Sequence, residues 1–122
     1  MNTVEFAKRI QTQEKLTGEE KERIIKQSIN WDGATLKYIV AVEELSELQK
    51  EITKQLRDES EYMNFLEELA DVYICLEYLK AINKVDEDML DKAISVKLER
   101  DHNRVIDELT YRKRITQGGL RW

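Results

Sequence analysis

Hydrophobic residues recur every three to four positions along most of the chain, which is the spacing of amphipathic helices. Four short polar or glycine-containing stretches interrupt this pattern, namely TGEE, NWDGA, RDES and NKVD. The interruptions predict five helices, at about 4–16, 17–30, 34–56, 61–82 and 86–116. The pattern therefore predicts an all-α fold, a four- to five-helix bundle that forms a single domain over residues 1–122.

Side chains suited to capping precede four of the predicted helices: Asn2 or Thr3, Thr17, Ser60 and Asp86. Thr17 also has Glu20 three residues further on, which is the pattern of a capping box. The glycines of QGG at 117–119 are suited to ending the last helix.

Two of the predicted helices, 34–56 and 61–82, carry acidic residues next to their hydrophobic stripes. At 100° per residue the two stripes consist of Ala41, Leu45, Leu48 and Ile52, and of Phe65, Leu69, Val72, Leu76 and Leu79. The acids that border these stripes are Glu44, Glu47 and Glu51 on the first helix and Glu68 and Asp71 on the second. If the stripes pack together, we expect the carboxylates of Glu44, Glu47, Glu68 and Asp71 to line one crevice.

A solvated helix surface is the ordinary explanation for either acidic pair alone. Glu44, Glu68 and Asp71, however, have no Lys or Arg three or four residues away, whereas the rest of the chain mixes its charges. Like charges beside a core are unfavourable, and a divalent cation would relieve their repulsion. Carboxylates without a thiolate or an imidazole suit Mg²⁺, with Mn²⁺ as a substitute. A di-iron bundle is excluded because it needs two Glu-x-x-His motifs, and His102 is the only histidine.

The last predicted helix offers a basic cluster, because Lys97, Arg100 and Arg104 fall on one of its faces. Three cations could bind phosphate oxygens, although basic residues on a solvated helix are the simpler explanation. Trp31 could stack on a base, or could equally be a core or interface residue.

The composition favours a helical protein and argues against several classes of partner and location. With 122 residues, no proline and 37% charged residues, the chain favours helices over sheets. Its net charge of −5 argues against binding to nucleic acid or to an anionic membrane. A single cysteine excludes an internal disulfide, and no apolar run has transmembrane length. These features predict a soluble cytoplasmic protein.

The two acidic motifs also resemble those of a known family. EELSEL at 43–48 and ELAD at 68–71 are similar to the Glu-x-x-Glu and Glu-x-x-Asp signature of the all-α nucleoside triphosphate pyrophosphohydrolases. This superfamily includes MazG-like proteins, dimeric dUTPases and dCTPase-type enzymes. INWDG at 29–33, EELADVYICLEYL at 67–79 and KLER at 97–100 resemble the small bacterial and phage MazG-like proteins, and the similarity covers about 6–119.

The resemblance implies Mg²⁺-dependent hydrolysis of a (deoxy)nucleoside triphosphate to the monophosphate and pyrophosphate. It also implies Glu44, Glu47, Glu68 and Asp71 as metal ligands, and a homodimer or homotetramer that completes the bundle. The dCTPase-type branch has a Tyr four residues after the motif Asp, where this chain has Cys75, so base preference is not carried over.

On this interpretation Glu44 or Glu47 takes the proton of the attacking water, while Lys97, Arg100 and Arg104 support the leaving pyrophosphate. Two alternatives stay open. One is a non-catalytic helical protein that docks a partner on its acidic strip. The other is a nucleotide-binding regulator without turnover.

Overall fold

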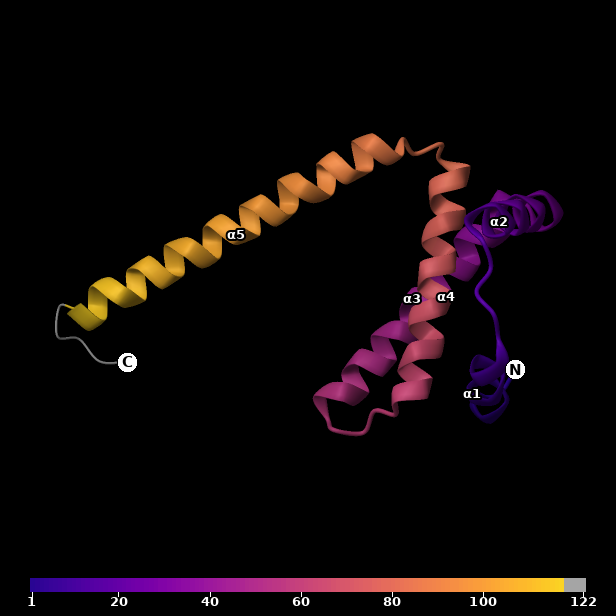
Figure 1. The fold of residues 1–122 in the computed structure, drawn as a ribbon, viewed down its shortest axis with the longest axis horizontal. Helices are drawn as coiled ribbons and strands as arrows, with labels where there is room; N and C mark the ends of the chain where they lie inside the picture. The colour runs from indigo at the N-terminus through magenta and orange to yellow at the C-terminus, as the bar shows by residue number, and fades with distance from the viewer. Residues whose placement is uncertain (118–122) are drawn as a thin grey trace. The chain divides into compact units, whose positions relative to one another are not determined.

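The computed structural model describes residues 1–117, and over these residues it contains five α-helices and no strand (Figure 1). The helices are α1 (Thr3–Thr12), α2 (Gly18–Asp32), α3 (Ala34–Leu56), α4 (Tyr62–Ile82) and α5 (Glu87–Gln117). The all-α prediction is confirmed. The chain divides into two units, residues 1–84 with α1 to α4 and residues 85–122 with α5, and each unit is described by itself.

Two of the predicted helix starts in residues 1–84 are confirmed by their hydrogen bonds. The Asn2 side chain accepts from the backbone N–H of Glu5 at 2.8 Å. Thr17 and Glu20 form the expected capping box, in which each side chain accepts from the other residue's backbone N–H at 3.1 Å. Since four N–H groups at each helix start lack partners within the helix, these contacts fix where α1 and α2 begin.

The predicted end of the first helix and the predicted cap of the fourth helix were wrong. The first helix ends at Thr12 instead of Leu16, because Gln13 is extended and the chain stays non-helical up to the Thr17 cap. Ser60 does not cap α4, whose N-cap is Glu61, with no capping hydrogen bond from its side chain. The turn after α3 passes through Asp58 at a positive φ of 57°, a conformation that Asp tolerates better than most residues. This turn shifts the helix start by one residue.

Gly33 separates α2 from α3 by a single residue. Its φ of 86° is accessible to glycine at little cost, and its N–H still donates to the Ile29 carbonyl at 2.8 Å. The joint therefore ends α2 at Asp32, two residues later than predicted, and allows α3 to begin at once.

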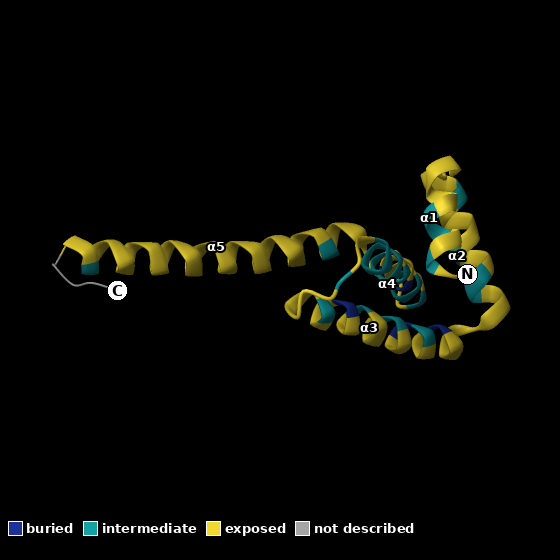
Figure 2. Cartoon of the chain, turned by 90° about the horizontal axis from the view of Figure 1, so that it is seen from below, coloured by how far each residue is buried: buried dark blue, intermediate teal, exposed yellow. Residues whose placement is uncertain are grey.

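The helices α3 and α4 lie side by side and antiparallel, and they share the most extensive packing in residues 1–84 (Figure 1). On α3 the packed side carries residues at alternating intervals of four and three, namely Lys37, Ala41, Glu44, Leu48 and Glu51. Figure 2 shows the buried positions of α3 on its side toward α4. On α4 the buried residues are Val72 and Cys75. Small side chains at Ala41 and Cys75 let the two backbones approach.

The predicted hydrophobic stripes were confirmed in part. Ala41 and Val72 are buried, and Leu48, Phe65, Leu69 and Leu79 are half-buried. Leu45, Ile52 and Leu76 were expected in the packed stripes, but all three are exposed. The packed side of α3 is therefore turned from the predicted stripe toward the acids beside it, and this brings Glu44 and Glu51 into the α3–α4 contact.

A buried lysine joins three helices of this unit. Lys37 on α3 is 5% exposed, and its Nζ donates to Ser28 Oγ and to Asp32 Oδ2 on α2, each at 2.7 Å. The same Nζ lies 4.2 Å from the ring centroid of Tyr78 on α4. Burial opposes the charge of Lys37, but the hydrogen bond to Asp32 and the neighbouring Tyr78 outweigh it and raise its pKa. Lys37 therefore stays charged and holds α2 against the α3–α4 pair.

The second unit consists of α5 as far as it is described. Asp86 caps this helix as expected, since its side chain accepts from the N–H of Asp88 at 3.3 Å. Almost every residue of α5 is exposed. The glycines expected to end the helix, at 118 and 119, lie outside the described residues. Over residues 1–117, no helix is both long and apolar enough to cross a membrane.

Candidate functional site

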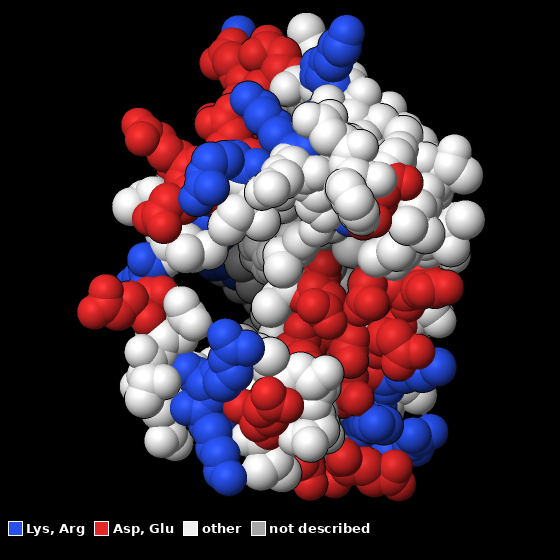
Figure 3. Space-filling model, turned by 90° about the vertical axis from the view of Figure 1, so that its right-hand side faces the viewer, with Lys and Arg blue, Asp and Glu red and all other residues white. Residues whose placement is uncertain are grey.

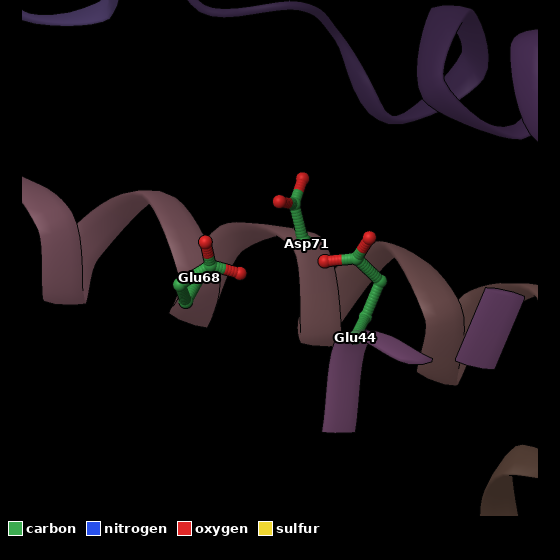
Figure 4. Close-up of side chains that lie close together, drawn as sticks. All are labelled: Glu44, Glu68 and Asp71. Carbon is green, nitrogen blue, oxygen red and sulfur yellow. The ribbon is translucent and has the colours of Figure 1, made fainter. Parts of the chain in front are cut away.

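Three carboxyl groups converge where α3 and α4 pack together. Glu44 comes from α3, and Glu68 and Asp71 come from α4 (Figure 4). One oxygen of each lies within 4.8 Å of one oxygen of each of the others. Glu44 reaches the other two because it stands on the packed side of α3, one turn after Ala41. We call Glu44, Glu68 and Asp71 the acidic cluster.

The protein raises the pKa of all three groups. Burial, followed by the charge of Asp71, a hydrogen bond with Asp71 and the charges of Glu68 and Glu47, raises the pKa of Glu44 to about 7. Burial also raises the pKa of Asp71, against the opposing effect of its hydrogen bond with Glu44. The metal-free cluster therefore holds a proton near neutral pH, shared between Glu44 and Asp71.

Glu68 supplies the observation that points most directly to a cation. Its Oε2 is buried and has no hydrogen-bond partner in the structure of residues 1–117. Burial and the charges of four neighbouring acids, beginning with Asp71 and Glu47, raise its pKa. A buried oxygen without a donor is costly unless something positive compensates it. Oxygen ligands from three carboxyl groups fit Mg²⁺ or Mn²⁺, so the residues present suit the metal that the sequence implied.

The fourth expected ligand, Glu47, is not part of the convergent group. Its side chain is 47% exposed and accepts from Lys50 Nζ at 3.0 Å, three residues along the helix. Its charge nevertheless contributes to the raised pKa of both Glu44 and Glu68. Glu47 therefore stands at the open edge of the acidic cluster.

Sequence reasoning missed Glu51, although it placed this residue beside the stripe. Glu51 is 6% exposed, and its Oε1 accepts from Lys54 Nζ at 3.1 Å. Its Oε2 is buried and has no hydrogen-bond partner among the described residues. The spacing from Lys37 through Glu44 to Glu51, seven residues each time, was the signal that could have placed all three on one packed side.

The residues expected to bind substrate are all exposed, Trp31 on α2 and three basic residues on α5. Lys97, Arg100 and Arg104 are exposed on α5, in the second unit. Arg104 is paired with Asp101 at 3.1 Å and with Glu108 at 2.7 Å, as expected for a solvated helix surface. Trp31 is 89% exposed in the last turn of α2, beside an open hollow of about 980 Å³ along that helix.

Acidic side chains gather over a broad area of the face shown in Figure 3, with basic side chains at its border. Such a face attracts cations and repels free phosphate groups. A polyanionic ligand would therefore bind here only together with a cation.

Comparison with family models, with curated proteins and with solved structures found no match to this chain.

Proposed function

We propose that this chain is a divalent-cation-dependent nucleoside triphosphate pyrophosphohydrolase of the all-α, MazG-like kind, which hydrolyses a (deoxy)nucleoside triphosphate to the monophosphate and pyrophosphate. One observation carries the proposal: Glu44, Glu68 and Asp71 converge from two helices, and Glu68 has a buried oxygen without a partner among the described residues. The motifs in which these residues stand, EELSEL and ELAD, supply the choice of reaction.

In this proposal Glu44, Glu68 and Asp71 hold Mg²⁺, or Mn²⁺ in its place. The ion supplies charge neutralisation for phosphate oxygens and acidifies a water molecule. Loss of the shared proton from Glu44 and Asp71 accompanies binding, since metal ligands must be deprotonated.

Glu47 is suited to accept the proton of the attacking water. It stands next to the acidic cluster, and its exposed side chain can turn toward a substrate on exchange of its contact with Lys50. Glu44 is the less suitable base because it lies within the cluster. Lys97, Arg100 and Arg104 remain the proposed contacts of the pyrophosphate, and Trp31 that of the base. Arg104 must give up its two ion pairs for this role.

An exposed apolar surface supports the proposal that the chain forms a homodimer or homotetramer. On α3 it comprises Tyr38, Val42, Leu45, Ile52 and Leu56, and on α4 Tyr62, Tyr73 and Leu76. We call these eight residues the apolar face. Val42 is 69% exposed and Leu56 is 83% exposed. A surface of this kind marks an interaction site in most soluble proteins.

The apolar face lies on one side of the α3–α4 pair. On each helix its residues fall within about 80° at 100° per residue. Because α3 and α4 are antiparallel, both sectors turn to the same side, away from the acidic cluster. A second copy presenting the same face would bury both and form a four-helix bundle.

The proposed activity is tested by incubating the purified protein with each common NTP and dNTP in Mg²⁺ and measuring pyrophosphate and monophosphate. At least one substrate should give both products in equal amounts, and Glu68→Gln should abolish the reaction. Glu43→Gln is the matched control, because Glu43 is an exposed acid on α3. Saturable binding of Mg²⁺ without turnover of any nucleotide would contradict the proposed enzyme activity and would favour a nucleotide-binding regulator. If the protein binds Mg²⁺ no better than Na⁺, the result would favour the non-catalytic alternative, in which the acidic strip docks a partner.

A further inference from the structure

Glu51 is a buried acid that the proposed reaction does not use. It is 6% exposed in the α3–α4 contact, and no described residue donates to its Oε2. An ionised carboxylate in such a place needs positive charge or donors on both oxygens. Lys54 serves only Oε1, at 3.1 Å. The second oxygen of Glu51 therefore lacks the partner that a buried carboxylate requires.

Glu68 belongs to the acidic cluster and is also a neighbour of Glu51. Glu51 follows Glu44 by seven residues on the packed side of α3, a rise of about 10 Å along the helix. Glu68 on α4 lies close enough to interact electrostatically with both Asp71 and Glu51. Its own Oε2 is also buried without a partner. Two partnerless oxygens, one from each helix, thus occur on either side of the same packing contact.

We propose that Glu51 and Glu68 hold a second divalent cation, so that Glu68 is shared between this position and the acidic cluster. The inference rests on the proposed metal site, to which it adds an acid from outside the two sequence motifs. With only carboxylate ligands, the second position takes a hard cation such as Mg²⁺ or Mn²⁺, which keeps most of its water.

Lys54 makes the second position weaker than the first. Its ammonium group lies 3.1 Å from Glu51 Oε1 and repels a cation bound at the neighbouring oxygen. The Lys54 side chain is 42% exposed, so it can swing into solvent when a cation takes its place. The second position therefore fills at higher cation concentration than the acidic cluster does.

Binding of Mn²⁺ to the full chain tests this inference without any substrate. Loss of the signal of free Mn²⁺ in electron paramagnetic resonance counts the bound ions at pH 8. The parent should bind two ions per chain. The Glu51→Gln variant should bind one ion, with unchanged affinity. The Glu68→Gln variant should bind neither ion tightly. Lys54→Gln should tighten the second ion by at least about threefold. Glu43→Gln is the control and should still bind two.

The pair of ions also has its own signature. Two Mn²⁺ ions that share a carboxylate lie about 4 Å apart and couple magnetically. The coupled spectrum should be present in the parent and absent in Glu51→Gln, with both proteins equally helical by circular dichroism. Lys54→Gln keeps Glu51, so its coupled spectrum tests the site even if Glu51→Gln folds poorly.

The outcomes separate the two proposals. One bound Mn²⁺ in the parent, unaffected by Glu51→Gln, would overturn the second position and leave the proposed function standing. Two ions that both survive Glu51→Gln would remove Glu51 as a ligand. No saturable binding to the parent at all would contradict the acidic cluster as a metal site, and with it the proposed function.

Discussion

Above about pH 7 the proton shared by Glu44 and Asp71 is lost. Without a cation, the carboxylates of Glu44, Glu68 and Asp71 then repel one another, so each of them destabilises the metal-free fold. We expect Glu44→Gln, Glu68→Gln and Asp71→Asn each to stabilise the protein in EDTA, by about 0.5–1 kcal/mol. For a domain of this size such a gain raises Tm by roughly 2–6 °C. Thermal unfolding followed by circular dichroism measures the change.

Glu43→Gln removes the same charge from an exposed position and should shift Tm little. Variants of the cluster that melt lower than the parent in EDTA would show that its carboxylates support the metal-free fold.

The raised pKa of Glu44 predicts how metal-free stability depends on pH. Its ordinary pKa is 4.5, and in the folded protein it is about 7. Between these values the unfolded chain has released the proton while the folded chain still holds it. The folded state therefore binds more protons, and the free energy of unfolding should fall as pH rises from about 4.5 to about 7.

Urea unfolding in EDTA at several pH values across this window measures that fall. Glu44→Gln should flatten the profile, and saturating Mg²⁺ should remove the fall, because the metal takes the place of the proton. A parent whose stability rises through the same window would contradict the assigned pKa.

Between elements, Lys37 is the contact whose loss should matter most for the first unit. Lys37→Met leaves Asp32 and Ser28 without their donor where α2 meets α3. Because the Asp32 side chain is 31% exposed and keeps some water, we expect a loss of about 2 kcal/mol, less than for a fully buried pair.

Urea unfolding of Lys37→Met, with the exposed Lys50→Met as its control, checks the size of the effect. Asp32→Asn combined with Lys37→Met should recover part of the loss, since no uncompensated charge then remains. Equal stability of Lys37→Met and Lys50→Met would rule out a structural role for Lys37.

The positions of the helices could be predicted from the sequence more closely than their faces. Helix starts depend on local signals, such as the capping box of Thr17 and Glu20, and these can be read from a few residues. Which side of α3 packs depends instead on the partner helix. Close approach at Ala41 and Cys75 turned Leu45 outward and Glu51 inward. Hydrophobicity along a single helix does not contain that information.

The candidate site could likewise be predicted where it depends on spacing along one helix, and not where it depends on packing between helices. Three of the four predicted acids converge. Glu68 and Asp71 do so together because residues three apart on a helix are neighbours on its surface, whereas Glu47, three residues after Glu44, pairs with Lys50 instead. Glu51 and Lys37 were missed because each looks like an ordinary surface charge in the sequence. Their burial arises only where α3 meets its neighbours.

For the molecule as a whole, the apolar face predicts self-association. Val42→Glu places a charge on this face, at a position that is 69% exposed in the single chain and should tolerate it. If a second copy covers this face, the variant should become monomeric while the parent is a dimer or tetramer. Light scattering coupled to size-exclusion chromatography at micromolar concentration measures the masses.

Ile74→Glu is the control, because Ile74 is also an exposed apolar residue of α4 but lies about 100° round the helix from Tyr73. A parent that is monomeric at these concentrations would contradict the proposed assembly.

We propose that the acidic cluster serves hydrolysis at the α-phosphorus, with pyrophosphate as the leaving group. An ATPase that attacks the γ-phosphorus usually has a glycine-rich phosphate loop, and no G-x-x-x-x-G-K-[ST] motif occurs in this sequence. Turnover of an accepted dNTP in ¹⁸O-labelled water, followed by mass spectrometry of the products, decides between the two. We predict the label in the monophosphate and none in pyrophosphate. Label in orthophosphate, with a nucleoside diphosphate as the other product, would contradict the claim.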